Sequence, residues 1–374
     1  MKEIIKVKKV ENKKELDLFV KLPFKIYRND KNFVPPLISE VKETLSKEKN
    51  PYFNHAEREL FLAYFKDEIV GRIAAIIDYN YINHHQKKVG FFGFFESIND
   101  FDIASALFDK AKEWLKAKGM ELMVGPANPA LNDECAFLYE GFSSPPTIKM
   151  PYNPPYYLEL VEKYGMSKAK DLYAYYIDLN QFVPEKVQNV VEKLKKKEKF
   201  IVRKVNLKKL DIELPKIKEV YNDAWQENWD FTPLTDEEIN YLGRKLKPIA
   251  KSEIIPIVEI DNEPVGISIA LPNYNEVLCH LNGRLFPFGI FKFFYYQRRI
   301  KSARLWALGI KKKFRKTGAD ALLYYETFLG GKKLGYEWGE VSWILEDNID
   351  IIKPIEVWKV KLYKKYRIYQ YPLS

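Results

Sequence analysis

A group of cationic residues followed by a glycine is the first stretch of this sequence whose residue types and spacing could do chemistry. The apolar run at residues 304–310 before it predicts a short buried strand, and the residues from Gly318 onward have the apolar spacing of a helix. A loop at the start of a helix offers backbone N–H groups and the positive end of the helix to a phosphate. The stretch therefore predicts a phosphate-binding loop, whose cationic residues are Lys311, Lys312, Lys313, Arg315 and Lys316.

Two carboxylates flank the next predicted strand, at residues 341–345. Glu340 precedes this strand and Glu346 follows it. A carboxylate in such a place can take a proton from an amine nucleophile. We prefer Glu346 as the general base because α/β sheets bind ligands at the carboxyl ends of their strands. The alternative is that Glu346 and Asp347 only cap the helix that follows.

The order of strand, cationic loop, helix and strand resembles the GNAT acyltransferase superfamily. Those enzymes hold the pyrophosphate of acetyl-CoA on a loop of the form Arg/Gln-x-x-Gly-x-Gly/Ala. Arg315 and Gly318 match its first two landmarks, whereas Asp320 stands where the family has a small residue. The resemblance implies that backbone N–H groups of Leu308, Gly309 and Ile310 polarise the acyl carbonyl. It also implies that the pyrophosphate is bound by Arg315, Lys316, Thr317, Gly318 and Ala319.

The resemblance is incomplete after the second of these strands. Asn348 is placed where the family often uses an asparagine to bind the pantetheine arm, although it could equally be a helix cap. The tyrosine that protonates the departing thiolate in the family is replaced here by Ile355. Tyrosines at 363, 366 and 369 lie in a strand-like segment nearby, and the sequence does not choose among them.

A repeat indicates that the chain contains a duplicated domain. Two predicted hairpins end in Val-Gly, and their glycines, Gly71 and Gly266, are 266 − 71 = 195 positions apart. Phe33 and Phe231 are 231 − 33 = 198 positions apart. Two landmarks at nearly one offset predict tandem domains at residues 1–185 and 195–374. A first strand at residues 4–10, then helices, a hairpin, a further strand and a helix is also the GNAT order, so we expect two GNAT-like α/β domains, each with a mixed central sheet flanked by helices.

The two halves differ in the charge of the loop that opens the long helix. The second half has the cationic loop described above, whereas residues 96–102 of the first half contain Glu96, Asp100 and Asp102 and no cation. A pyrophosphate is attracted by the first loop and repelled by the second. We therefore expect acyl-CoA in the C-terminal half and a degenerate N-terminal half. The alternative is that the cations form a solvated turn and the acidic residues are helix caps.

Composition excludes several classes of protein. The chain has 374 residues and a net charge of +10, which favours an anionic partner. No apolar run reaches the roughly 18 residues of a membrane span, and the N-terminus lacks the apolar region of a signal peptide, so we expect a cytoplasmic protein. The two cysteines, Cys135 and Cys279, do not form a disulfide framework. The four histidines show no ligand spacing, so no metal site is expected.

An aromatic insertion at residues 285–296 follows the second hairpin. One interpretation is a helix or flap that fills the interface between the two domains. The other is a hydrophobic lid over an acyl chain or a lipid-like acceptor, with Arg298 and Arg299 near a negative group.

The function that the sequence favours is transfer of an acetyl group, or another acyl group, from its coenzyme A thioester to the amine of a small molecule or peptide. One alternative is a non-catalytic protein of GNAT fold that binds or senses coenzyme A. A second is an aminoacyl-tRNA-dependent transferase, which only the basic charge balance supports, so nucleic acid is not the expected partner.

Overall fold

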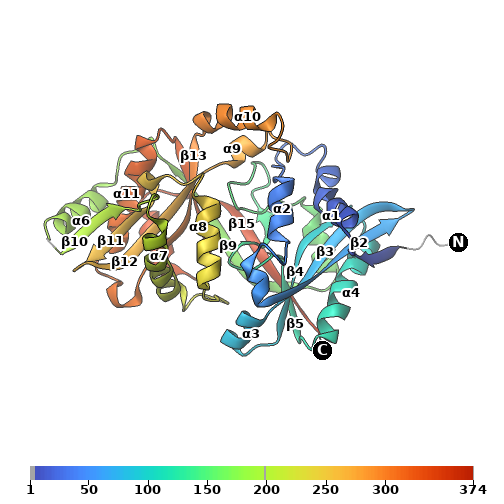
Figure 1. The fold of residues 1–374 in the computed structure, drawn as a ribbon. Coiled ribbons are helices and arrows are strands. Elements are labelled where there is room, and N and C mark those ends of the chain that lie inside the picture. Colours follow the sequence, from blue (N-terminus) through green and yellow to red (C-terminus); the bar gives the residue numbers. More distant parts are fainter. Residues whose placement is uncertain (1–4, 198, 374) are drawn as a thin grey trace. The chain divides into compact units, whose positions relative to one another are not determined.

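The computed structural model describes residues 5–197 and 199–373, so Ile4, where the first strand was expected to begin, and position 198 lie outside the described residues. The chain divides into two compact units (Figure 1). Unit 1 consists of the described residues within Met1–Leu172, Leu278–Phe293 and Lys364–Ser374. Unit 2 consists of Tyr173–Val277 and Phe294–Tyr363. The boundaries 1–185 and 195–374 remain our proposal for the two copies of the duplicated sequence.

Unit 1 is built on a mixed sheet in the order β1-β2-β3-β4-β5-β15, with β8 also paired to β15. All of these pairs are antiparallel except β4 with β5. The strands are β1 (Lys6–Lys9), β2 (Ala56–Phe65), β3 (Glu68–Asp78), β4 (Val89–Ser97), β5 (Leu122–Gly125), β6 (Ala127–Asn128), β7 (Glu134–Cys135), β8 (Phe137–Glu140) and β15 (Lys361–Pro372), the last of which enters the unit at Lys364. The helices are α1 (Lys13–Ile26), α2 (Ile38–Thr44), α3 (Tyr79–His85), α4 (Phe101–Ala117) and α5 (Tyr156–Lys163), with a 3-10 turn at Pro51–Asn54.

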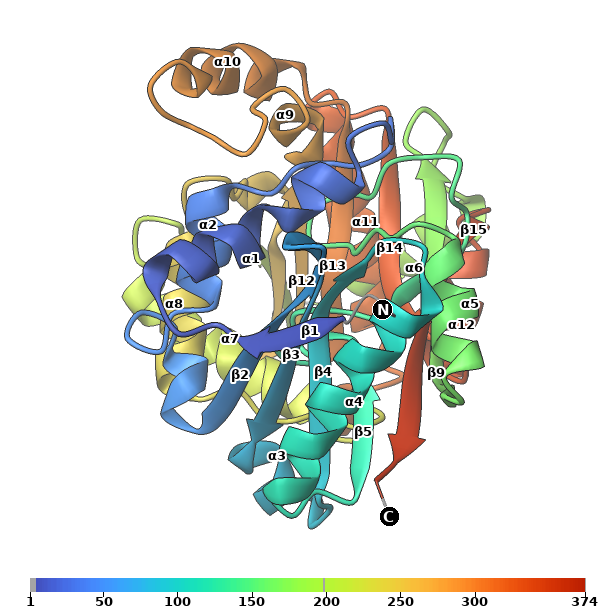
Figure 2. The same ribbon diagram turned by 90° about the vertical axis from the view of Figure 1, so that its right-hand side faces the viewer.

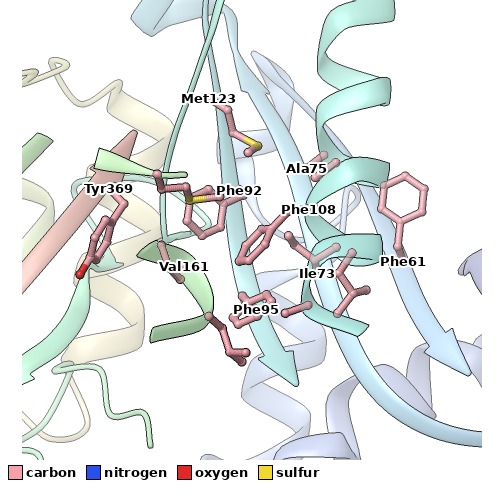
Figure 3. Packing of buried hydrophobic residues seen from close by; sticks show 14 of the residues in the cluster. Phe61, Ile73, Ala75, Phe92, Phe95, Phe108, Met123, Val161 and Tyr369 are labelled. Carbon is pink, nitrogen blue, oxygen red and sulfur yellow. The ribbon is translucent and has the colours of Figure 1, made fainter. Parts of the chain in front are cut away.

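Helix α4 covers one face of the unit 1 sheet (Figure 2). Asp100 caps it by accepting hydrogen bonds from the backbone N–H groups of Asp102 and Ile103, at 2.9 and 3.2 Å. Its apolar stripe packs with strand residues in one buried aromatic-rich core (Figure 3). A Cβ at Gly71 would lie 2.6 Å from Leu107, so this glycine lets the helix approach β3 closely.

Unit 2 repeats this plan with the order β9-β14-β13-β12-β11-β10. Its strands are β10 (Phe200–Lys204), β11 (Pro256–Ile260), β12 (Glu263–Pro272), β13 (Ser302–Ile310) and β14 (Trp338–Leu345), and β9 (Ser167–Asp178) enters the unit at Tyr173. Its helices are α6 (Glu185–Lys195), α7 (Leu210–Trp225), α8 (Asp236–Leu246), α11 (Ala319–Lys333) and α12 (Ile349–Glu356), with 3-10 turns at Ser252–Ile254 and Lys312–Phe314. The segment around the aromatic insertion, of which Leu278–Phe293 belongs to unit 1, contains α9 (Asn275–Leu278), α10 (Gly289–Tyr296) and a 3-10 turn at Gln297–Arg299.

The two predicted hairpins are confirmed. In β2–β3 the turn residues Lys66 and Asp67 have φ of 50° and 63°, and in β11–β12 Asp261 and Asn262 have φ of 51° and 65°. Two successive residues with positive φ form the turn that matches the right-handed twist of paired strands. The repeated sequence pattern therefore encodes the same local structure twice.

Gly266 has the same role in unit 2 that Gly71 has in unit 1. A Cβ there would lie 2.3 Å from Ile310 and 3.2 Å from Leu323 of α11. The next residue, Ile267, packs with buried residues of α7 and α8. Because successive strand residues point to opposite faces, α11 covers one face of the unit 2 sheet and α7 with α8 the other. Helix α11 ends at Lys333, shortly before Gly335 at φ 81°.

Candidate active site

Strands β13 and β14 of unit 2 separate along their length. Their parallel pairing runs only from Ser302↔Trp338 to Leu305↔Val341, although β13 continues to Ile310 and β14 to Leu345. On its other edge β13 stays paired with β12 as far as Gly266↔Ile310, with a register shift between Ile269 and Ala270. We call the region beyond the last β13–β14 pair the β13–β14 split. The predicted carbonyl-binding residues Leu308, Gly309 and Ile310 lie on its β13 edge.

The predicted phosphate loop joins β13 to α11. Gly318 occupies the N-cap of α11 with φ of 89°, a conformation that favours glycine, and a Cβ there would lie 2.7 Å from Leu194. Thr317 donates its hydroxyl to the carbonyl of Phe314 at 2.7 Å. Gly318 has no side chain with which to cap the helix, and the Thr317 hydroxyl accepts a long hydrogen bond from the backbone N–H of Ala319, at 3.4 Å. The structure thus brings Lys316, Thr317, Gly318 and Ala319 together at a helix N-terminus.

The cations of this loop are largely paired, which the sequence did not indicate. Lys311 is buried, and its ammonium group lies 2.5 Å from a carboxylate oxygen of Glu219 and 3.0 Å from one of Glu263. Burial alone would lower the pKa of Lys311, but the two carboxylates outweigh it and raise that pKa. Lys311 therefore anchors the loop instead of facing a ligand.

Glu227, just after α7, binds two further cations. Its carboxylate lies 2.5 Å from the ammonium group of Lys312 and 2.9 Å from the guanidinium of Arg315, and these hydrogen bonds lower its pKa. The backbone N–H of Lys312 donates to Asp223 at 2.6 Å, and Arg315 also donates to the carbonyl of Ala224 at 3.0 Å. The loop contains five cations and no acidic residue, but carboxylates that are distant in the sequence pair with three of them, Lys311, Lys312 and Arg315.

A buried polar cluster lies at the start of the β13–β14 split. Glu340 is fully buried and Arg304 is 1% exposed. The Nε of Arg304 lies 3.9 Å from Oε1 of Glu340. Ser342 joins them: its hydroxyl hydrogen-bonds Glu340 and accepts from the Arg304 guanidinium at 2.8 Å. The hydroxyl of Tyr363 donates to the other oxygen of Glu340. Of the tyrosines left open by the sequence, Tyr363 is thus the one that contacts a candidate catalytic carboxylate.

An apolar cavity of about 60 Å³ lies beside this cluster, wholly within unit 2. Its walls come from the two separating strands, from α11 and from the region of α12. The lining residues include Leu305, Tyr324, Phe328, Glu340, Val341 and Ile355. Ile355, which stands in place of the family's tyrosine, is one of these apolar wall residues.

Tyr324 of α11 gives this cavity a polar atom. The residue is 7% exposed, and its hydroxyl has no hydrogen-bond partner among the described residues. Burial and, secondarily, the charge of Asp320 raise the pKa of this hydroxyl, so it keeps its proton at neutral pH. A buried donor without a partner is uncommon and is satisfied when a ligand supplies an acceptor.

The other predicted site residues lie at the far end of β14. Glu346 is half-buried in the turn after the strand, and Asn348 is the N-cap residue of α12. The Asn348 side chain makes no capping hydrogen bond, so its amide is not used as the cap that the alternative interpretation required.

The equivalent region of unit 1 is filled by the chain itself. Strands β4 and β5 pair from Val89↔Leu122 to Phe91↔Val124 and then separate. The backbone N–H of Phe94, on the separated part of β4, donates to the side-chain carbonyl of Asn128 at 2.6 Å. A Cβ at Gly93 would lie 1.8 Å from the carbonyl oxygen of Ala127, so backbone fills this space. In unit 2, the atoms nearest to a Cβ placed on Gly309 of β13 belong to side chains of α7, at 2.2 Å for Trp225 and 2.7 Å for Ala224.

Glu96 is not part of a loop, which corrects the sequence interpretation. It lies in β4, where it accepts hydrogen bonds from Tyr27 at 2.8 Å and from Tyr157 at 2.7 Å, and it lies 3.3 Å from Arg72. Burial raises the pKa of Glu96 despite the nearby guanidinium. Asp100 is the helix cap that the alternative interpretation described. The acidic residues of the first half are therefore explained by a buried cluster and a cap.

Neither a metal site nor a membrane-spanning helix is found in the part of the chain that the structure describes. No group of histidine, cysteine, aspartate and glutamate side chains there is arranged to hold a metal ion. No described helix is both long and apolar enough to cross a membrane.

Solved structures show the fold. A tandem GNAT protein from the clavulanic acid biosynthesis pathway matches 99% of this chain and 99% of its own, with a TM-score of 0.60 at 10% identity. A GCN5-related N-acetyltransferase from Sphaerobacter thermophilus matches 99% of this chain and 96% of its own, with a TM-score of 0.56 at 11% identity. The chain has the tandem GNAT fold, as the sequence predicted.

Sequence comparison then gives the family within that class. The chain is 35% identical over 368 residues to the bacterial ceramide synthase of Caulobacter vibrioides, covering 96% of both chains. It is 33% identical over 369 residues to Protein YghO of Escherichia coli, covering 96% of this chain and 93% of that one. It belongs to the family that contains these two proteins. No family model matches the sequence.

Proposed function

We propose that this protein is an acyl-CoA-dependent N-acyltransferase whose reaction takes place in unit 2. The observation that carries the proposal is the difference between the two splits: the β13–β14 split is followed by a glycine-containing helix start, whereas the β4–β5 split is filled by Asn128 and Ala127. An acyl-CoA requires an unfilled edge of β13 for its thioester and backbone N–H groups for its pyrophosphate.

The reaction joins an amine nitrogen to the thioester carbon and breaks the carbon–sulfur bond. In the proposed mechanism, backbone N–H groups of residues 308–310 stabilise the negative oxygen that develops on the thioester carbonyl. Glu346 takes the proton that the amine loses, and Glu340 is the second candidate for this task. The thiolate of coenzyme A takes a proton as it leaves from the hydroxyl of Tyr324 or of Tyr363, and that tyrosine then regains the proton that the carboxylate took from the amine.

We further propose that the acyl group is longer than acetyl and that the acceptor is an amino lipid. A ceramide synthase is one of the relatives, and a ceramide is the amide of a fatty acid with a long-chain amino alcohol. The cavity beside Glu340 has mostly apolar walls, including Leu305, Phe328 and Val341, which suit methylene groups better than a charged or peptide acceptor. Acetyl transfer to a small molecule or peptide is the competing assignment.

The test compares acetyl-CoA and palmitoyl-CoA, each with a panel of a long-chain amino alcohol, glucosamine and a lysine peptide. Free thiol release reports turnover, and mass spectrometry identifies the amide. We expect amide formation from palmitoyl-CoA and the amino alcohol, and a loss of about 100-fold or more in kcat for Glu346→Gln or Glu340→Gln, whichever is the base. The matched control is Glu337→Gln, which makes the same chemical change at an exposed residue just before β14.

Three results would redirect the assignment. Turnover of acetyl-CoA with glucosamine or the peptide alone would remove the lipid proposal and keep the enzyme class. Binding of coenzyme A without turnover of any pair would favour the non-catalytic binding protein, which the replacement of the family's tyrosine by Ile355 supports. Tight, steeply salt-dependent binding of RNA would favour the aminoacyl-tRNA alternative.

A further inference from the structure

Helix α10 has aromatic side chains on two faces. Ile290, Phe293, Tyr296 and Gln297 are half-buried and form the face that packs against the protein. A second set consists of exposed apolar side chains, two in the turn just before α10 and three on α10 itself, which we call the aromatic ridge. Its members are Phe286 (70% exposed), Phe288 (77%), Phe291 (72%), Phe294 (54%) and Tyr295 (52%).

The spacing makes the ridge continuous. Phe288, Phe291 and Tyr295 follow one another at intervals of three and four residues, and Phe294 lies beside them, so their side chains share one side of the helix. Exposure of a large aromatic side chain to water is unfavourable, and a contiguous group of exposed aromatic side chains marks an interaction surface.

The charges around the ridge identify the partner. Residues 281–301 contain Arg284, Lys292, Arg298, Arg299 and Lys301 and no acidic residue. Arg298 and Arg299 continue the ridge in the 3-10 turn after α10, and the Arg299 guanidinium lies 4.1 Å from the centre of the Tyr295 ring. A protein partner with an apolar groove would not require this one-sided charge. Aromatic side chains bordered by cations match the surface of an anionic bilayer, which offers acyl chains and negative headgroups together.

We propose that α10 docks this protein on an anionic lipid bilayer, with the helix lying in the interface plane and the aromatic ridge inserted among the headgroups. The ridge and its charges carry this proposal independently of the reaction in unit 2. Docking places the enzyme where a water-insoluble amine and the amide made from it both reside.

The experiment is co-sedimentation of the full chain with vesicles of phosphatidylcholine alone or of phosphatidylcholine mixed with phosphatidylglycerol. We expect binding to the mixed vesicles, weak binding to phosphatidylcholine, and release by salt. Phe288→Ser combined with Phe291→Ser should weaken binding to the mixed vesicles by about tenfold or more, since each removes exposed apolar surface. Arg298→Glu combined with Arg299→Glu should weaken it by a similar factor and abolish the preference for phosphatidylglycerol.

The matched control is Phe182→Ser, which removes an aromatic side chain that is 91% exposed elsewhere in the chain. Circular dichroism and thermal melting of each variant check that it is folded, and the charge variant tests the proposal without changing any apolar residue. Three results would overturn the proposal. They are failure of the unmodified protein to bind the mixed vesicles, equal binding of both vesicle types, and a ridge variant that binds as before. A change from dimer to monomer in light scattering, with vesicle binding intact, would assign the ridge to self-association instead.

Discussion

Glu227 and Arg315 allow the phosphate-loop proposal to be tested from both directions. In the structure Arg315 donates to Glu227 at 2.9 Å, so a bound pyrophosphate must compete with that carboxylate for the guanidinium. Arg315→Glu replaces the cation by an anion, whereas Glu227→Gln keeps the side-chain shape and removes only the competing charge. If the loop binds the pyrophosphate of an acyl-CoA, the two substitutions should change its affinity in opposite directions.

The magnitude follows from Coulomb's law at the surface. Arg315 is partly exposed, with 35% of its side chain accessible, so the dielectric of water is the conservative choice. A pair of unit charges about 4 Å apart is then worth about 1 kcal/mol, and Arg315→Glu changes two such charges, or about 2 kcal/mol. This corresponds to a dissociation constant raised about 30-fold. Glu227→Gln removes one charge that lies farther from the ligand, so we expect about threefold tighter binding.

The assay is calorimetric titration of the full chain with coenzyme A at low and at high salt. Both effects should shrink at about 1 M salt, where the screening length falls to about 3 Å. Lys116→Glu, an exposed residue in the last turn of α4, makes the same change in net charge far along the sequence and should leave the affinity unchanged. Equal affinities for Arg315→Glu and the unmodified protein, or weaker binding by Glu227→Gln, would refute the assignment of the pyrophosphate to this loop.

Three further outcomes are expected. Tyr324→Phe should raise the free energy of unfolding slightly, by up to about 1 kcal/mol, because it removes a buried hydroxyl without a partner among the described residues. If that hydroxyl serves the reaction, the same substitution should lower kcat by about tenfold or more, and unchanged kinetics would exclude Tyr324 as the proton donor. Asn128→Ala should cost about 1–3 kcal/mol in thermal or urea unfolding, because the N–H of Phe94 loses its acceptor, and an unchanged melting temperature would contradict this. Asp171→Asn should cost about 3 kcal/mol, because Arg367 loses its paired carboxylate, which lies 2.7 Å away. Burial raises the pKa of Asp171, but the bonds to Arg367 and Lys168 outweigh this effect and lower that pKa. The stabilisation is therefore present above about pH 4 and is lost on acidification. In urea unfolding at several pH values, the difference in free energy of unfolding between the unmodified protein and Asp171→Asn should shrink below that pH.

The parts of the fold that the sequence predicted are those set by neighbouring residues. The two hairpins followed from alternating apolar residues around short polar turns, and the structure has two-residue turns at Lys66–Asp67 and Asp261–Asn262. Helix α11 and strands β13 and β14 were predicted from the spacing of apolar residues and from the glycine at the helix start. Each of these signals is local, and tertiary packing did not override it.

The electrostatics of the candidate site could not be predicted in the same way. The loop at residues 311–318 is cationic by sequence. Glu219 and Asp223 of α7, and Glu227 just after it, lie 85 to 92 positions earlier than the cations that they contact and reach the loop only through the fold. The spacing of four residues between these three carboxylates is the one sequence signal that they share a helix side and could contact a cationic segment.

Burial was equally hard to predict for the most apolar segment. A run as aromatic as residues 285–296 usually indicates a core, yet α10 exposes a whole side of such residues. Conversely, Glu340 and Ser342 sit two positions apart in an otherwise apolar strand and are fully enclosed, and only that alternation in β14 suggested a polar cluster facing one side.

The last strand of the unit 1 sheet has a consequence for how this protein is made. Tyr369 of β15 pairs with Gly125 of β5, so residues translated after nearly all of unit 2 are required before the edge of β5 is covered. Until then a nascent polypeptide emerging from the ribosome displays an open strand edge, which invites mispairing with other chains. Most of unit 1 is therefore synthesised long before its sheet can be completed, and during that interval the open edge of β5 can pair with other chains.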